Sequence, residues 1–197
     1  MGFGKSFLLS LVAFVGLNFI FIILYFILGP GIGILLSSIE TAPLLIIYYL
    51  FCSIIFFPSN SLTGIPVVDG VDVSGVNWIM VEPFITVDIA YIVLGIGYLI
   101  APIIAAILAG RFGESKGQSF GGWALTSAIS TAAVIIVAIS GFSSTFQGIM
   151  EDSLSSTFQL TQPLMFEQIL IFGLISSLIN IIFYGFFALL MSKIEYY

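Results

Sequence analysis

The residues best placed for chemistry are polar side chains inside otherwise apolar sequence. Glu40 lies in the apolar run 32–57, and its polar neighbours within one helical turn are Ser37, Ser38 and Thr41. An ionisable side chain within a membrane segment is costly, so it usually faces a protein interior, a water-filled cavity or a partner. Pro43 follows closely, and proline removes a backbone hydrogen bond. This pattern predicts a broken helix of the kind that transporters use to bind substrates.

Two amide side chains, Asn18 and Asn180, also lie in apolar runs. Together with Glu40 and Thr41 they form a candidate intramembrane polar site, which could relay a proton or a cation. A structural explanation of Glu40 is also open, because near the start of its helix the membrane interface or a hydrogen bond to either Asn would satisfy it. Asn side chains in membrane helices most often hold neighbouring helices together, at about 1 kcal/mol each. We interpret Asn18 and Asn180 in that way.

The composition predicts an integral membrane protein. Of the 197 residues, 60% are hydrophobic and only 7% are charged, and the mean hydropathy is +1.24. A soluble domain usually has about 25% charged residues and could not expose so much apolar surface. The apolar runs are also much longer than the roughly 9 to 11 residues of a barrel strand, and they do not alternate with polar residues. We therefore expect membrane-spanning helices.

We expect one all-α transmembrane domain over residues 1–197, divided into spans by short polar segments. Gly29-Pro30-Gly31 ends the first apolar run, because Pro and Gly together stop a helix and allow a tight turn. The stretches 58–85 and 143–164 are rich in turn-forming or polar residues, so both are expected to be loops on the outer side. The second span should be kinked near Pro43. The five predicted transmembrane helices are at about 6–28, 32–57, 87–110, 120–142 and 165–191.

Basic residues set the expected orientation, because cytoplasmic loops carry an excess of Lys and Arg. Five spans would put the two termini on opposite sides. With the C-terminus inside, Arg111, Lys116 and Lys193 anchor the inner surface and only Lys5 lies outside. The reverse arrangement would place three basic residues outside, so we expect the N-terminus outside and the C-terminus inside. The lack of His, the single Cys and the acidic loops suggest a prokaryotic cell membrane.

The expected outer loops carry half of the acidic residues. Residues 65–75 alternate Val with polar residues around Asp69-Gly70, which predicts a small β-hairpin. Asp69 and Asp72 could offer oxygen ligands to Ca²⁺, but their spacing does not match an EF-hand loop and acidic turns are usually solvated, so we expect no metal site. An outer amphipathic helix within 143–164 is predicted from apolar residues at helical spacing, namely Phe146, Ile149, Met150, Leu154 and Phe158.

Small residues recur four apart on the third and fourth predicted spans, and such stripes let two helix backbones approach closely. These helix-packing candidates are Gly97, Ala101, Ala105 and Ala109 on the third span, and Ala124, Ala128 and Ala132 on the fourth. The two stripes could face each other across the short turn at 111–119. Alternatively, one stripe could be the docking face for another subunit.

Several classes of function are disfavoured by the sequence. It contains no His and one Cys, which removes His-based catalysis, His/Cys zinc sites and intrachain disulfides. Neither a nucleophile elbow nor the spacing of a phosphate-binding loop is present. The net charge of −6 argues against nucleic acid as a partner. We therefore expect neither an enzyme nor a bound cofactor.

Two functional classes stay open. In the first, the chain is a non-catalytic polytopic membrane subunit or a self-assembling scaffold, which contacts the lipid bilayer and forms a homo-oligomer or binds other membrane subunits. In the second, it is a small ion or solute transporter or channel with an intramembrane site at the broken second helix. We expect the first, because five spans with almost no polar lining leave little room for a solvated path within one chain.

Overall fold

The computed structural model describes residues 2–41, 43–55, 89–140 and 166–192, and every regular element within them is helical. Most of these residues belong to four long helices, α1 (Gly2–Leu28), α6 (Ile89–Phe112), α7 (Lys116–Ser140) and α9 (Phe166–Met191). Within the described part of the chain, these are the four helices long and apolar enough to cross a membrane. The fold is therefore compatible with a membrane location.

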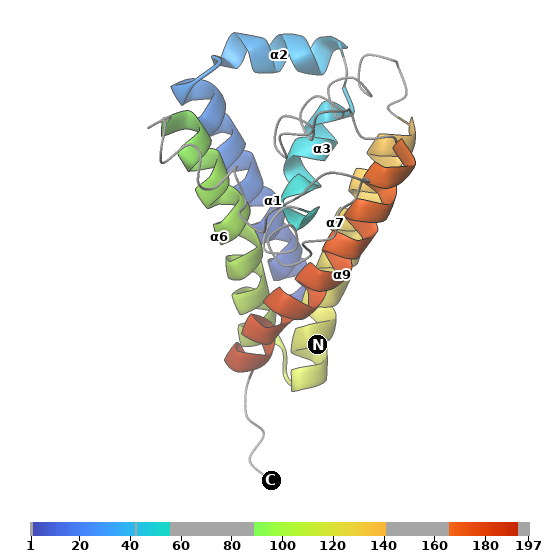
Figure 1. The fold of residues 1–197 in the computed structure, drawn as a ribbon. Helices are drawn as coiled ribbons and strands as arrows, with labels where there is room; N and C mark the ends of the chain where they lie inside the picture. Colours follow the sequence, from blue (N-terminus) through green and yellow to red (C-terminus); the bar gives the residue numbers. More distant parts are fainter. Residues whose placement is uncertain (1, 42, 56–88, 141–165, 193–197) are drawn as a thin grey trace.

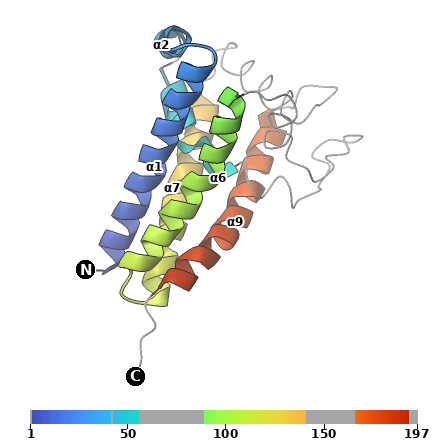
Figure 2. The ribbon, with the colours of Figure 1, turned by 90° about the vertical axis from the view of Figure 1, so that its left-hand side faces the viewer.

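The four long helices form two pairs that converge at one end of the bundle and diverge toward the other (Figure 1). One pair is α1 with α6, which run side by side in Figure 2, and the other is α7 with α9. Where the pairs converge, α1 and α7 begin and α6 and α9 end. Lys5, Arg111 and Lys116 are exposed there, so we call this the basic end and its opposite the far end.

The second predicted span is wrong, because residues 32–55 form three short helices instead of a long one. α2 (Ile32–Thr41) lies across the far end, and α3 (Leu45–Phe51) runs from there into the bundle and continues as the 3₁₀ helix η1 (Cys52–Ile55). Pro43 lies between α2 and α3, so the helix breaks there and is not merely kinked. At about 1.5 Å per α-helical residue and about 2 Å per 3₁₀ residue, α3 and η1 cover roughly 18 Å, too short for a bilayer core of about 30 Å.

A tight turn after α1 lets α2 lie across the far end. Gly31 has a φ of +94°, a left-handed conformation that glycine adopts easily, and its amide donates to the Phe26 carbonyl at 2.7 Å. Leu35 of α2 packs back onto α1, where it is buried with Ile22 and Phe26. The predicted break at Gly29-Pro30-Gly31 is thus confirmed as a turn.

The described residues contain four candidate spans, and the start of α1 and the end of α9 lie at the same end of the bundle (Figure 1). This corrects the prediction of five spans with the termini on opposite sides. The other four predicted spans agree with the observed helices to within a few residues. The β-hairpin predicted at 65–75 and the amphipathic helix predicted within 143–164 lie outside the described residues, and the described ranges contain no strand to support a hairpin.

The α6 stripe of small residues packs against α1. Its four members, Gly97, Ala101, Ala105 and Ala109, are all buried. The Ser6 hydroxyl of α1 donates to the Ala109 carbonyl at 2.8 Å, and a Cβ added to Gly97 would collide with Phe21 of α1. This stripe therefore brings the α6 backbone close to α1 and does not serve a hairpin with α7.

The buried face of α7 is not its alanine stripe. Ala128 and Ala132 are exposed, and Ala124 is half-buried. A bundle interior favours hydroxyls that bond to a carbonyl one turn earlier or to a neighbouring helix. Accordingly, the buried face of α7 carries Ser119, Trp123, Thr126, Ser127, Ser130 and Thr131. The two alanine-containing stripes therefore do not meet.

A capped turn joins α6 to α7 at the basic end. The Ser115 hydroxyl accepts a hydrogen bond from the backbone N–H of Gln118 at 3.3 Å. The side-chain Oε1 of Gln118 accepts one from the backbone N–H of Glu114 at 3.2 Å, much as in a capping box. Near this turn, Gly110 lies so close to the Ala188 carbonyl of α9 that no side chain would fit. The basic end is thus tightly packed.

Candidate functional site

The segment α3–η1 runs into the bundle, where the structure describes it as far as Ile55. Two amide side chains donate hydrogen bonds to carbonyl groups of this segment. Asn18 Nδ2 of α1 donates to the Leu50 carbonyl at 2.9 Å and to the Ser53 hydroxyl at 2.8 Å. Asn180 Nδ2 of α9 donates to the Ile54 carbonyl. We call Asn18, Asn180 and the backbone that they hold the asparagine clasp.

The clasp lies near the middle of the bundle, because both Asn18 and Asn180 are central in their helices. An unpaired carbonyl is costly in a water-poor interior, so the two amide donors stabilise the backbone of this segment at that depth. Backbone carbonyls only accept hydrogen bonds, so the NH₂ side of each amide must face them. The two Oδ1 atoms are consequently directed away from the carbonyls that the amides hold.

Hydroxyl groups from α7 and α9 lie at the same level as the clasp. Thr131 Oγ1 and Ser177 Oγ are hydrogen-bonded, which aligns these two antiparallel helices. One turn closer to the basic end lie Ser127 on α7 and Asn180 on α9. Ser176 lies one turn before Asn180 and is fully buried. The clasp is therefore bordered by Ser and Thr side chains of two helices.

Five buried polar atoms have no hydrogen-bond partner within the part of the chain that the structure describes. They are Asn18 Oδ1, Asn180 Oδ1 and the hydroxyls of Ser10, Ser127 and Ser176. All except the Ser10 hydroxyl belong to the clasp or lie within about one turn of its level. A buried polar atom without a partner costs about 1 to 3 kcal/mol, and such atoms are rare in native proteins. The arrangement is suited to a ligand that supplies hydrogen-bond donors or positive charge.

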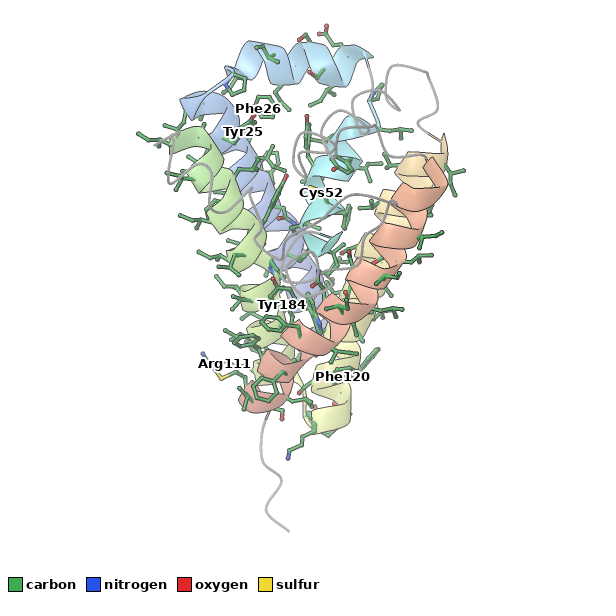
Figure 3. All side chains as sticks on the ribbon, in the orientation of Figure 1. Tyr25, Phe26, Cys52, Arg111, Phe120 and Tyr184 are labelled. Atoms are coloured by element: carbon green, nitrogen blue, oxygen red, sulfur yellow. The ribbon has the colours of Figure 1, made fainter. Side chains whose placement is uncertain are left out.

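An aromatic layer closes the bundle between the clasp and the basic end. Phe14 and Tyr184 lie four residues from the two clasp asparagines, about 6 Å along each helix. Both rings contact Trp123, with centroid distances of 6.4 Å and 5.7 Å, and all three side chains are fully buried. Trp123 Nε1 donates to the Ile181 carbonyl at 3.1 Å, which fixes the indole in place. Figure 3 shows Tyr184 nearer the basic end than Cys52 of η1.

Cys52 connects η1 to α6. Its Sγ lies 3.4 Å from the Tyr98 hydroxyl, and both side chains are buried. Three helices, α1, α6 and α9, therefore hold the short segment through Asn18, Tyr98 and Asn180 respectively. The segment is positioned by the whole bundle and not by its own length.

The four residues of the predicted polar site are divided in the structure. Asn18 and Asn180 meet at the clasp, where they bind consecutive turns of one backbone segment. Glu40 is exposed near the end of α2 at the far end, and Thr41 is the last residue of that helix. The amides of the two asparagines donate to α3–η1 and not to Glu40.

The predicted anchor residues lie away from the clasp. Arg111 and Lys116 are exposed at the basic end, as Figure 3 shows for Arg111. Lys193 lies outside the described residues and directly follows Ser192, at the end of α9.

Sequence reasoning missed the hydroxyl residues around the clasp, namely Ser53, Ser127, Thr131, Ser176 and Ser177. A signal for them exists in the helical spacing, since Ser176 precedes Asn180 by one turn and Ser127 precedes Thr131 by one turn. Ser and Thr are common in membrane helices, however, and many only bond to a carbonyl of their own helix. Spacing alone therefore does not distinguish hydroxyls at the clasp from hydroxyls that bond only to their own helix.

Among the described residues, no group of three or more His, Cys, Asp or Glu side chains is placed to hold a metal ion. The calcium candidates Asp69 and Asp72 lie outside those residues. No family model matches the chain, and neither a curated protein nor a solved structure shows a significant match to it.

Proposed function

We propose that the protein is a small membrane carrier or channel whose translocation site is the asparagine clasp. One observation carries the proposal: a short helical segment enters the bundle, reaches its middle, and is held there by two amides whose oxygens have no partner among the described residues. Broken helices of this kind are tolerated at membrane depth where they line a cavity or are buried in protein, and transporters place binding sites at them. The proposal involves no covalent chemistry.

A membrane setting is supported by the outward faces of the helices. Large apolar side chains such as Val12, Ile136 and Ile182 are exposed on α1, α7 and α9. The charged side chains that the structure describes are all exposed and lie toward the two ends of the bundle. The middle of each helix therefore presents hydrocarbon to its surroundings, as a lipid-facing surface requires.

We further propose that the basic end faces the cytoplasm, so that both termini are inside. Lys5, Arg111 and Lys116 lie at that end, and Lys193 directly follows the end of α9. One topology with four spans thus gathers all four basic residues of the chain on one side, which the positive-inside rule favours. This replaces the N-terminus-outside arrangement expected from five spans. A prokaryotic cell membrane is still the expectation from composition.

The proposal is tested by solute flux into proteoliposomes that contain the purified protein. The panel comprises Na⁺, K⁺, glycerol and urea, which covers small cations and small neutral solutes. We expect the protein to accelerate the entry of at least one of them well above the rate in liposomes with an unrelated four-helix membrane protein at the same protein-to-lipid ratio. Equal rates for all four solutes would contradict transport.

A second candidate function is a membrane subunit or self-assembling scaffold. Its support is the exposed alanine stripe of α7, where Ala128 and Ala132 leave a smooth face that a second helix could approach. The partners would be a second copy of the chain or other membrane subunits. Native mass spectrometry after gentle extraction should then show an assembly, which Ala128→Leu disrupts and the control Ile136→Leu does not. A wild-type protein that is monomeric would exclude this function.

A further inference from the structure

The chemistry of the asparagine clasp indicates which class of solute it takes, and this inference rests on the transport function proposed above. We infer that the clasp binds a partly dehydrated monovalent cation, such as Na⁺ or K⁺, through uncharged oxygen atoms. Three observations carry the inference: the buried acceptor atoms at the clasp that have no partner among the described residues, the direction of α3–η1, and the placement of the charged residues.

Buried acceptor atoms without a partner among the described residues gather at the clasp. The NH₂ group of Asn18 donates to the Leu50 carbonyl and to the Ser53 hydroxyl, and the NH₂ group of Asn180 donates to the Ile54 carbonyl. Their Oδ1 atoms are buried without a partner, and an amide oxygen can only accept. The hydroxyls of Ser127 and Ser176 are likewise buried without partners and offer lone pairs. A cation satisfies several such oxygens at once, because amide and hydroxyl oxygens are suitable ligands for hard ions.

The backbone adds negative potential at the same place. α3 begins near the far end and runs into the bundle, so its C-terminal end and η1 lie at the clasp. The carbonyl end of a helix carries partial negative charge, and half-helices that end within a membrane commonly direct it at Na⁺ or H⁺. The direction of α3–η1 therefore favours a positive ligand over an anion.

The placement of charged side chains limits the charge of the ion. All the charged side chains that the structure describes are exposed, and none is at the clasp; they are Lys5, Glu40, Arg111, Glu114 and Lys116. Without a carboxylate, a site of neutral oxygens does not offset the free energy of dehydrating a divalent ion, which requires anionic ligands. Among the described residues, no Lys or Arg side chain lies close enough to the clasp to repel a single positive charge. A monovalent cation fits these conditions best.

A neutral solute is the alternative to a cation. Such a molecule usually presents both donors and acceptors, and the hydroxyls of Ser127 and Ser176 could donate to its oxygens. The negative potential at the carbonyl end of α3 favours a positive charge over a neutral molecule, so a cation fits better. Bound water alone is the other occupant that the experiment below separates from a cation.

Cation binding is measured by the thermal unfolding midpoint of the purified protein in a nonionic detergent. The buffers contain NaCl, KCl or N-methylglucamine chloride at equal ionic strength, so that only the cation differs. We expect Na⁺ or K⁺ to raise the midpoint in a saturable way relative to the large organic cation, because a ligand that binds the folded state stabilises it. Occupation by water alone predicts the same midpoint in all three salts, which would overturn the inference.

Two serine variants on α7 locate the site. Ser127→Ala removes a hydroxyl without a partner, whereas the matched control Ser130→Ala removes one that donates to the Thr126 carbonyl at 2.8 Å. We expect Ser127→Ala to raise the apparent dissociation constant of the cation about tenfold and Ser130→Ala to leave it unchanged. In the organic-cation buffer, Ser127→Ala should be at least as stable as the wild type. An equal effect of both variants on the dissociation constant would contradict a site at the clasp.

The failure of this inference can be told apart from the failure of the transport proposal. Accelerated flux of glycerol or urea, together with no cation-specific change of the midpoint, would overturn the cation site and leave transport standing. An unfolding midpoint that rises in Na⁺ or K⁺, together with no flux of any solute, would support the binding site and contradict transport.

Discussion

The basic-end half of the bundle and its middle contain similar polar residues but use them differently. At the basic end, the Ser6 hydroxyl of α1 donates to the Ala109 carbonyl of α6 at 2.8 Å, and the Ser119 hydroxyl of α7 donates to the Gly110 carbonyl of α6 at 3.1 Å. These two bonds connect α1 and α7 to α6. At the middle, the amides of Asn18 and Asn180 also bind backbone carbonyls but leave two oxygens without partners.

The difference teaches how a structural polar group is recognised. Where every donor finds an acceptor, as at the Ser6 and Ser119 hydroxyls, the polar atoms add rigidity and nothing is left for a ligand. Where buried oxygens have no partner among the described residues, as at the clasp, the fold has an energetic cost that a bound ligand can relieve. Ser10 lies between the two regions, since its hydroxyl is buried without a partner although Ser6 one turn away is bonded.

The largest effect is expected from a side chain added at the tightly packed end. Gly110→Val would push into the Ala188 carbonyl of α9, and overpacking of this kind costs about 1 to 3 kcal/mol or more. We expect a large fall in the thermal midpoint and in the yield of monodisperse protein. The matched control Gly16→Val, at a position with nothing nearby, should have little effect. Equal losses in the two variants would argue against close packing of α6 on α9.

A smaller loss of stability is expected at the clasp. Asn180→Leu removes the donor to the Ile54 carbonyl and leaves that carbonyl buried and unpaired, at a cost of about 1 to 3 kcal/mol. Thermal unfolding in detergent measures the change. An Asn180→Leu protein as stable as the wild type would show that α3–η1 is not held by this amide.

The aromatic layer should show a still smaller effect. Trp123→Phe keeps an aromatic ring against Phe14 and Tyr184 but loses the hydrogen bond to the Ile181 carbonyl, worth about 0.5 to 1.5 kcal/mol. The fall in the thermal midpoint should be reproducible but modest, with the far-ultraviolet circular dichroism unchanged. A collapse of the fold would mean that the indole does more than this single bond indicates.

The smallest effect is expected at Glu40. The side chain is exposed at the far end, away from the clasp, so Glu40→Gln should change stability by no more than about 0.5 kcal/mol and leave solute flux unchanged. This outcome would show that the charged residue at the far end has no part in the function proposed for the clasp. Abolished flux in Glu40→Gln would instead restore the relay role that the sequence allowed.

Hydropathy was sufficient to predict four of the helices but not residues 32–55. Apolar runs as long as those of α1, α6, α7 and α9 are stable as helices in a membrane, so the length of each run predicts the length of its helix. Residues 32–55 are equally apolar, and their break depends on features that hydropathy ignores. Pro43 interrupts the helix, and hydrogen bonds from Asn18 and Asn180 on distant helices hold the short segment that follows inside the bundle.

The candidate site was predictable in its residue types but not in its geometry. Asn18 and Asn180 stand out in apolar sequence, yet nothing in the sequence says that both donate to the same short segment. Glu40 stands out more, but the turn at Gly31 places its helix across the far end. The alanines of α7 show the same limit, because the small residues at this spacing are all buried on α6, whereas Ala128 and Ala132 are exposed on α7.

The central claim is that the asparagine clasp is the translocation site. Its most direct test is the flux of the transported solute in proteoliposomes, normalised to folded protein, for the wild type, Asn180→Leu and the control Ser119→Ala, which loses a hydrogen bond at the basic end. We predict a loss of flux of at least about tenfold in Asn180→Leu and near-wild-type flux in Ser119→Ala. Equal flux in the wild type and in a folded Asn180→Leu protein would contradict the claim.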